Sequence, residues 1–382
     1  MKRPASPLLA LAALPLALLA TGACRRVKPV ARIAVTGPLT GDLAPEGLGM
    51  RRAVEMAVAD TQAGAEAPWR LEIVSHDDRA DPAAAEQVAA RIVADPTVAA
   101  VIGHITSGCS IAAAKIYSPA SLAMITPSAT SPEVTMQQVR SDWTGARVVF
   151  RIPASDAVLG AYTAEYAYDR FNLRRVALIH DGTPYGRELS DAFQRRFEGK
   201  GGKILPVREV RRGQTDFRDL LGELRGLQPD GLFFGGIYTE FGGLLKTARE
   251  MGLTFPFIAG DGAKAAELFA IAGAAAEGAY LAVSGVPVED TPSAADFVES
   301  YRKRYGEEPR VFDHYAYEAG LIAAECLRRD GTDREQVLEC VRTTQHSGML
   351  GNIVFDSKGD TLKSIVTMTR ADAKRRRFQP LY

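Results

Sequence analysis

Short apolar segments alternate with longer segments of helical periodicity along this chain, and this alternation limits the possible folds more than any other feature. In the first part, strands are expected at 32–35, 71–75, 98–103 and 122–125, and a clear helical pattern covers 82–94. Such alternation predicts a parallel sheet covered by helices on both faces. The same order begins again beyond residue 153, with strands expected at 176–180, 204–207, 231–234 and 257–258 and helices at 156–171 and 216–227. The chain is therefore predicted to be an α/β protein with two Rossmann-like lobes.

The segment after residue 284 is too short to form a third lobe. It contains helical patterns at 317–328 and 333–342, followed by two strands joined by a turn, at 352–355 and 365–368. We expect this tail to complete both lobes, so that the chain crosses between them more than once. The prediction assigns residues 31–153 and 285–352 to an N-terminal lobe, and residues 154–284 and 353–382 to a C-terminal lobe.

The first 23 residues have the parts of an export signal: Lys2 and Arg3, an apolar run at 8–20, and small residues before Cys24. The run is shorter than the ~20 residues that span a bilayer, although a retained anchor helix remains an alternative. Cys24 after Gly-Ala resembles the lipobox of bacterial lipoproteins, except that Thr21 stands where Leu is usual. We expect an exported protein, tethered by a lipid on Cys24 and a linker at 24–30, in the periplasm or at the cell surface.

Composition excludes several classes of protein. Lys plus Arg and Asp plus Glu both number 46, so no net field favours nucleic acid or an acidic membrane surface.

Cys326 and Cys340 lie on consecutive predicted helices joined by a tight turn, and a disulfide between them is as consistent with the sequence as two free thiols. Cys109 is expected to be a small buried residue. The cysteine spacing fits no metal site, and no cofactor is expected.

Hydroxyl-bearing residues follow two consecutive predicted strands. Thr106 and Ser107 come after the strand at 98–103, and Thr126, Ser128 and Thr130 come after the strand at 122–125. The carboxyl ends of neighbouring parallel strands lie side by side, where open α/β sheets bind ligands. A helix that begins near Ser107 also directs its free N–H groups to that edge. The sequence therefore predicts a pocket for a small anion such as a carboxylate.

Several segments, in this order and spacing, resemble the leucine/isoleucine/valine-binding proteins, the type I periplasmic binding proteins of ABC importers. The segments are IAVTGPLTGDLA, HDDRADP, VIGHITSG, MITPSATSPEVT, ALIHDGTPYG, FFGGIY and AGAAAEGAY. The resemblance extends from residue 33 to the C-terminal strands. It implies two lobes joined by three crossings, which close on an amino acid held between strand ends and present it to a membrane permease.

The resemblance also implies roles for individual residues of the N-terminal lobe. Ser107 would bind the ligand carboxylate through its hydroxyl and N–H groups, with Ile105 and Thr106 beside it. Ser128 and Thr130 would contact the ammonium and the carboxylate, Ser128 largely through its backbone.

From the second lobe, Tyr185 would close over the ligand. Asp261 stands where the family keeps an acid, usually Glu, that pairs with the ammonium group. Tyr238 and Phe312 correspond to aromatic residues of the pocket wall.

Three features depart from the family pattern. Glu46 stands in place of an aromatic residue, Ile237 replaces the first of two aromatics, and Ala80 and Thr106 occupy the positions of a disulfide found in close relatives. A Glu46 that pointed into the pocket would require a polar or cationic group on the ligand. We favour an outward orientation, because an unpaired buried carboxylate is costly.

Enzyme motifs are absent from the sequence, which contains no phosphate-binding loop, no His-Glu-x-x-His and no Gly-x-Ser-x-Gly. His104 is expected to be a core histidine bonded to backbone rather than a base, and Asp77 and Asp78 are expected to form structural hydrogen bonds rather than a metal site. We therefore expect a binding protein that recognises a small amino acid, branched-chain or related. A tethered sensor of an amino acid or amide that signals through a membrane partner is the alternative.

Overall fold

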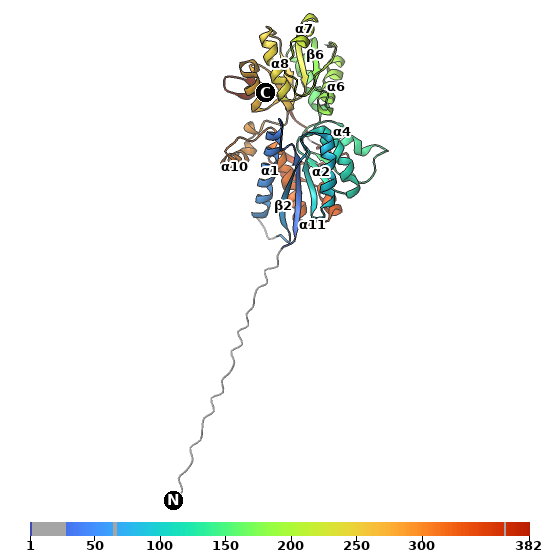
Figure 1. Ribbon diagram of the computed structural model, residues 1–382. Helices are drawn as coiled ribbons and strands as arrows, with labels where there is room; N and C mark the ends of the chain where they lie inside the picture. The colour runs from blue at the N-terminus through green and yellow to red at the C-terminus, as the bar shows by residue number, and fades with distance from the viewer. Residues whose placement is uncertain (2–27, 64–66, 363) are drawn as a thin grey trace.

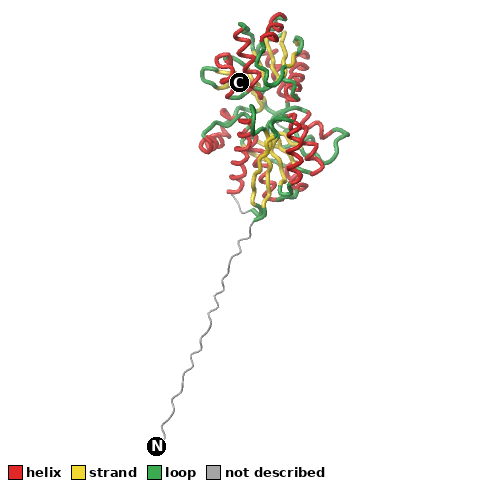
Figure 2. The backbone as a smooth tube through the Cα atoms, viewed as in Figure 1, coloured by secondary structure: helices red, strands yellow, loops and turns green. Residues whose placement is uncertain are grey.

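The computed structural model describes residues 1, 28–63, 67–362 and 364–382 and has two lobes, each built on its own sheet (Figure 1). Cys24 and residues 2–23 of the expected export signal lie outside the described residues. Strands run through the middle of each lobe and helices lie around them (Figure 2). The α/β class and the two-lobed architecture expected from the sequence are confirmed.

The first lobe contains a five-stranded parallel sheet with the strand order β2-β1-β3-β4-β5. Its strands are β1 (Val30–Gly37), β2 (Arg70–Asp77), β3 (Val98–Gly103), β4 (Ala123–Thr126) and β5 (Val149–Arg151). Its helices are α1 (Ala44–Ala63), α2 (Pro82–Ala94), α3 (Ser107–Tyr117), α4 (Glu133–Met136), α10 (Ala295–Tyr305), α11 (Asp313–Asp330) and α12 (Arg334–Arg342). Every residue of β3 is buried, because helices cover both faces of the sheet.

The second lobe contains an eight-stranded sheet whose main path is β15-β14-β11-β10-β9-β6-β7, and β8 also pairs with β6. Its strands are β6 (Arg175–His180), β7 (Lys203–Ile204), β8 (Arg208–Glu209), β9 (Gly231–Gly235), β10 (Phe257–Ala259), β11 (Tyr280–Ser284), β14 (Val366–Asp372) and β15 (Arg377–Leu381). Its helices are α5 (Asp156–Asp169), α6 (Pro184–Gly199), α7 (Arg218–Gly226), α8 (Tyr238–Glu250) and α9 (Ala266–Ala272). Strands β14 and β15 are antiparallel to their neighbours, and apolar clusters fill both faces of this sheet.

The chain passes between the lobes three times, between β5 and α5, between β11 and α10, and before β14. On the last passage, Ile353 and Phe355 still pack in the core of the first lobe. Arg151 of β5 also forms an ion pair with Asp360. The first lobe therefore extends beyond residue 352, where the sequence analysis placed its end.

Helix starts at the cleft follow from local sequence. Asp81 accepts a hydrogen bond from the N–H group of Ala84 and caps α2, whose first residue is Pro82. Thr183 caps α6 in the same way through Gly186. A polar cap followed by proline at the first helical position is a strong start signal, so these two helices begin at fixed points at the edge of their sheets.

One expectation about strands is wrong, and the sequence leaves the pairing of the two closing strands open. The strand expected at 204–207 is two short strands, β7 and β8, because Pro206 between them has no N–H group to donate to a ladder. The two closing strands do not pair with each other. Strand β13 (Gly351–Ile353) pairs with β12 (His346–Gly348), and β14 joins the sheet of the second lobe.

Cys326 and Cys340 form a disulfide between α11 and α12, with their Cα atoms 5.8 Å apart. Cys109 is buried and free. Among the helices of the described residues, none combines the length and the apolar character needed to cross a membrane.

Candidate functional site

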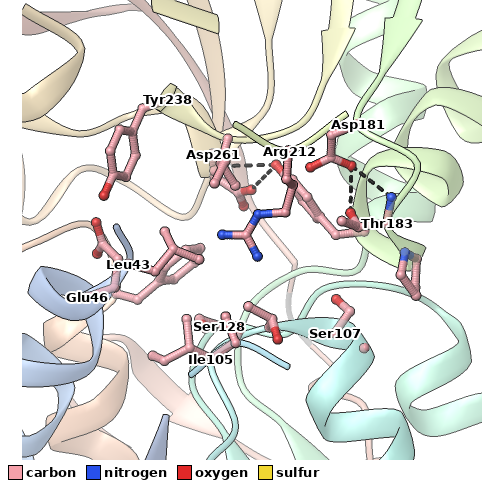
Figure 3. Close-up of a pocket in the computed structure, with 18 of the residues that line it drawn as sticks. Leu43, Glu46, Ile105, Ser107, Ser128, Asp181, Thr183, Arg212, Tyr238 and Asp261 are labelled. Carbon is pink, nitrogen blue, oxygen red and sulfur yellow. Dashed lines mark hydrogen bonds between the residues drawn. The ribbon is translucent and has the colours of Figure 1, made fainter. Parts of the chain in front are cut away.

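A cavity of about 280 Å³ lies between the two lobes (Figure 3). The first lobe contributes Leu43, Glu46, Ala80, Pro82, Ile105, Thr106, Ser107, Gly108, Ser128, Val311 and Phe312 to its wall. The second lobe contributes Asp181, Thr183, Pro184, Tyr185, Arg212, Ile237, Tyr238, Asp261, Gly262 and Lys264. Eight of the nine ligand-binding residues expected from the sequence thus lie on one cavity, and Thr130 is the exception.

The N-terminus of α3 forms the polar part of the first-lobe wall. Thr106 occupies the N-cap position without a side-chain cap, so N–H groups of the first turn of α3 remain available to a ligand. The Ser107 hydroxyl accepts a hydrogen bond from the N–H group of Ser131, at 3.2 Å, and keeps its own proton free to donate. An uncapped helix start and a free hydroxyl donor suit a carboxylate.

Ser128 and Thr130 form hydrogen bonds within the protein, in contrast to the free hydroxyl donor of Ser107. The Ser128 hydroxyl donates to the carbonyl of Ile105 at 2.7 Å, which ties together the two loops that follow β3 and β4. Thr130 is buried behind the wall, where its carbonyl accepts hydrogen bonds from Arg151 and from the N–H group of Asp156, both at 2.8 Å.

Asp261 is an acid of the second-lobe wall with one carboxylate oxygen that accepts no hydrogen bond within the described residues. It follows β10, and its Oδ1 accepts a hydrogen bond from the Tyr185 hydroxyl at 2.9 Å. Oδ2 has no hydrogen-bond partner among the described residues. Gly262 allows the Tyr185 ring to approach, since a Cβ atom at this position would lie 2.9 Å from the ring. Burial raises the pKa of Asp261 to about 6. A buried carboxylate with a free oxygen is a natural acceptor for a cation.

A second acid, Asp156, lies behind this part of the wall at the start of α5. It is fully buried, and neither of its carboxylate oxygens has a hydrogen-bond partner within the described chain. Burial and the nearby charge of Asp261 raise the pKa of Asp156 well above its usual range. The raised pKa favours the neutral form of Asp156, so Asp261 is the acid of this pair that offers a free carboxylate oxygen on the cavity wall.

Glu46 lies on the cavity wall, so the expectation of an outward orientation is wrong. The positive charge of Arg310 stabilises the carboxylate of Glu46 in this orientation. Its Nη2 donates hydrogen bonds to Glu46 Oε1 and to Glu267 Oε2, both at 2.7 Å. Burial opposes the charge of Arg310, but the hydrogen bond to Glu46 raises its pKa. Because Glu46 is already paired, its presence does not require a cationic ligand.

Contacts that cross the cleft join the lobes around the cavity. The Tyr238 hydroxyl of α8 donates to the carbonyl of Asp42 at 2.7 Å. The Ser131 hydroxyl donates to Glu188 of α6. The ion pair between Arg310 and Glu267 also connects the two lobes.

Sequence reasoning missed three cationic residues near the site: Arg212, Lys264 and Arg310. No motif marks them, because each reaches the cleft from a loop or from the start of a short segment. His104 is a buried core histidine as expected, but its ring bonds the side chains of Asp78, at 2.6 Å, and Tyr117 rather than the backbone. The structural hydrogen bonding expected of Asp78 is confirmed. No cluster of three potential metal ligands occurs within the described ranges.

Comparisons with known proteins agree with this geometry. A family model described as periplasmic binding protein matches residues 30–376. The leucine-, isoleucine-, valine-, threonine-, and alanine-binding protein of Pseudomonas aeruginosa is 31% identical over 331 residues, which cover 86% of each chain. A crystal structure of a leucine-binding protein from Thermotoga maritima has a TM-score of 0.82 at 30% identity and covers 92% of this chain and 98% of its own. A branched-chain amino acid transporter substrate-binding protein from Streptococcus pneumoniae, in complex with isoleucine, has a TM-score of 0.81 at 25% identity. The match covers 92% of this chain and 99% of the Streptococcus pneumoniae chain.

Proposed function

This chain belongs to the periplasmic binding protein family, and from that membership we propose that it binds a branched-chain or related amino acid between its lobes. In this proposal the protein is the exported, lipid-tethered receptor of an ABC importer. The three similar proteins described above are named as binding proteins, and the ligands in their names are amino acids with uncharged side chains.

One observation supports the proposal most directly: the free Oδ2 of Asp261 and the uncapped start of α3 line the same cavity from opposite lobes. An amino acid carries an ammonium group and a carboxylate, which these two features would bind. Leu43, Ile105, Ile237 and Phe312 offer an apolar surface for its side chain.

This arrangement couples binding to closure of the cleft. A ligand that is held at one end by α3 and at the other by Asp261 contacts both lobes only when they are together. It therefore stabilises the closed arrangement over an open one, which is the requirement for a ligand-driven population shift. The closed form would then be recognised by the membrane permease, with the lipid on Cys24 keeping the receptor near it.

Thermal unfolding of the mature protein in the presence of single amino acids tests the proposal. A ligand present at about 100 times its dissociation constant should stabilise the protein by ~2.7 kcal/mol, which is a clear rise in Tm. L-Leucine, L-isoleucine and L-valine should raise Tm in wild type and much less in Asp261→Asn. A panel of all the common amino acids that leaves Tm unchanged would contradict the proposed function.

A further inference from the structure

A hydrogen-bonded turn holds Arg212 at the cleft. The N–H group of Gln214 donates to the carbonyl of Arg211 at 3.0 Å, and Gly213, at the third position, has a φ of +78°. A positive φ at this position is typical of a type II turn, which places Arg212 at the exposed second position. The N–H group of Gly213 also donates to the buried Glu240 at 2.7 Å, so α8 anchors the turn.

Arg212 has no partner of its own. Its guanidinium group forms no hydrogen bond or ion pair with any residue that the structure describes, although it lines the cavity. Figure 3 shows the side chain extending from the second lobe into the space between the lobes. Asp181 lies on the same wall and forms no ion pair with Arg212; its Oδ1 accepts hydrogen bonds from the N–H and hydroxyl groups of Thr183 at 3.0 and 2.6 Å. Burial raises the pKa of Asp181, and the charge of Arg212 offsets part of that rise.

Several charged side chains of the cavity wall already have partners. Glu46 is paired with Arg310 and Lys264 with Glu289, and Asp181 accepts hydrogen bonds from Thr183, which carries no charge. The guanidinium group of Arg212 has no hydrogen bond or ion pair among the described residues, and Oδ2 of Asp261 is a buried carboxylate oxygen without a partner. A cation and a buried carboxylate oxygen that both lack partners match a ligand with one carboxylate, one ammonium group and an uncharged side chain.

We propose that Arg212 is the counter-ion of the ligand's carboxylate and makes the site selective for zwitterions with a single carboxylate. This inference rests on the proposed amino-acid binding function. The start of α3 offers only a partial positive charge, equivalent to about half a unit. Arg212 adds a full charge from the opposite lobe, so the carboxylate itself connects the two lobes. A second carboxylate on the ligand would face apolar residues such as Leu43 and Phe312 without a counter-charge.

Isothermal titration with L-leucine compares wild type, Arg212→Gln, Arg212→Lys and the control Arg211→Gln. Arg211 belongs to the same turn but not to the cavity wall, so its variant should bind within about twofold of wild type. Arg212→Gln should bind at least about tenfold more weakly, which corresponds to ~1.4 kcal/mol, and Arg212→Lys should recover part of that affinity because it keeps the charge. Unliganded Tm should be unchanged, since Arg212 has no partner to lose.

The outcomes separate this inference from the function on which it rests. If wild type binds no zwitterionic amino acid, the proposed function fails and the inference with it. If wild type binds leucine and Arg212→Gln binds within about twofold of it, the inference alone is overturned. It is also overturned if Arg212→Lys binds no better than Arg212→Gln, or if the Arg211 control loses as much affinity as the Arg212 variant.

Discussion

Acidification should weaken amino-acid binding, because the ammonium group of the ligand requires the ionised form of Asp261. Burial raises the pKa of this carboxyl to about 6, and the hydrogen bond from Tyr185 offsets only part of that effect. Pairing with an ammonium group favours the ionised form and lowers the same pKa in the complex. Affinity should therefore be highest above the pKa of the free protein and should fall as the pH decreases through about 6.

The size of the effect follows from the ionised fraction of the free protein. At pH 5, about one unit below the pKa of Asp261, roughly one carboxyl in eleven is ionised, so the apparent affinity should be about tenfold lower than at pH 7.5. Isothermal titration with L-leucine at several pH values between these limits measures the decline. Leucine keeps both of its charges over this range, so the decline reports on the protein.

Asp261→Asn is the control for this experiment. The variant keeps the shape of the side chain, should bind weakly at every pH, and should show no decline of this kind. Asp156 remains in the variant, and its pKa is also raised, by burial and by Asp261. A constant wild-type affinity from pH 5 to pH 7.5, or an equal decline in the variant, would refute the role given to Asp261.

Three further predictions concern the protein around the site. Glu267→Gln removes an ion pair that crosses the cleft and should weaken leucine binding about two- to fivefold, as measured by isothermal titration. The control Glu223→Gln removes an exposed ion pair within one lobe and should leave leucine affinity unchanged. Equal effects of the two substitutions would contradict a role for the pair that crosses the cleft. Replacing Cys326 and Cys340 by Ser opens a loop with a sequence separation of 14 and should lower the free energy of unfolding by ~3 kcal/mol in urea, with leucine affinity unchanged. Arg151→Met leaves buried acceptors without their donor and should cost ~3–5 kcal/mol of stability in the same assay; a loss below ~1 kcal/mol would be inconsistent with a buried ion pair.

The sequence predicts well whatever depends on local periodicity. The apolar run of β3 and the hydroxyl groups after β3 and β4 are each contained in a few consecutive residues. Because parallel strands align their carboxyl ends, these local features are enough to place Ser107 and Ser128 on one cavity. Asp261 and Tyr185 are different, since only the resemblance to a known family singled them out.

Features that depend on distant partners could not be predicted in this way. Arg310 pairs with Glu46 across 264 positions of sequence and with Glu267 across 43, and no periodic pattern reports such a pair. The expectation of an outward Glu46 is wrong for this reason. It considers the free-energy cost of burying the carboxylate without the ion pair with Arg310 that offsets this cost. Likewise, the apolar pattern of 365–368 indicates a strand but does not say which sheet it joins, and β14 in fact pairs with β11.

The balance between contacts made by the protein and contacts made by the ligand decides whether the cleft closes only when it is occupied. The cross-cleft contacts without ligand include the hydrogen bond from Tyr238 to Asp42, the bonds from the Ser131 hydroxyl and the Glu133 N–H group to Glu188, and the pair between Arg310 and Glu267. Contacts of these kinds contribute about 0.5–1.5 kcal/mol each. Removing one partner of a buried charge pair costs ~2–5 kcal/mol, much of it the penalty of the charge left unpaired, so in the proposed complex the ammonium group at Asp261 adds a contact at least as strong as any one of these. In that proposal, the two charged ends of the ligand, bound by Asp261 and Arg212, add to the protein's own contacts only in the closed arrangement and therefore favour it over the open one.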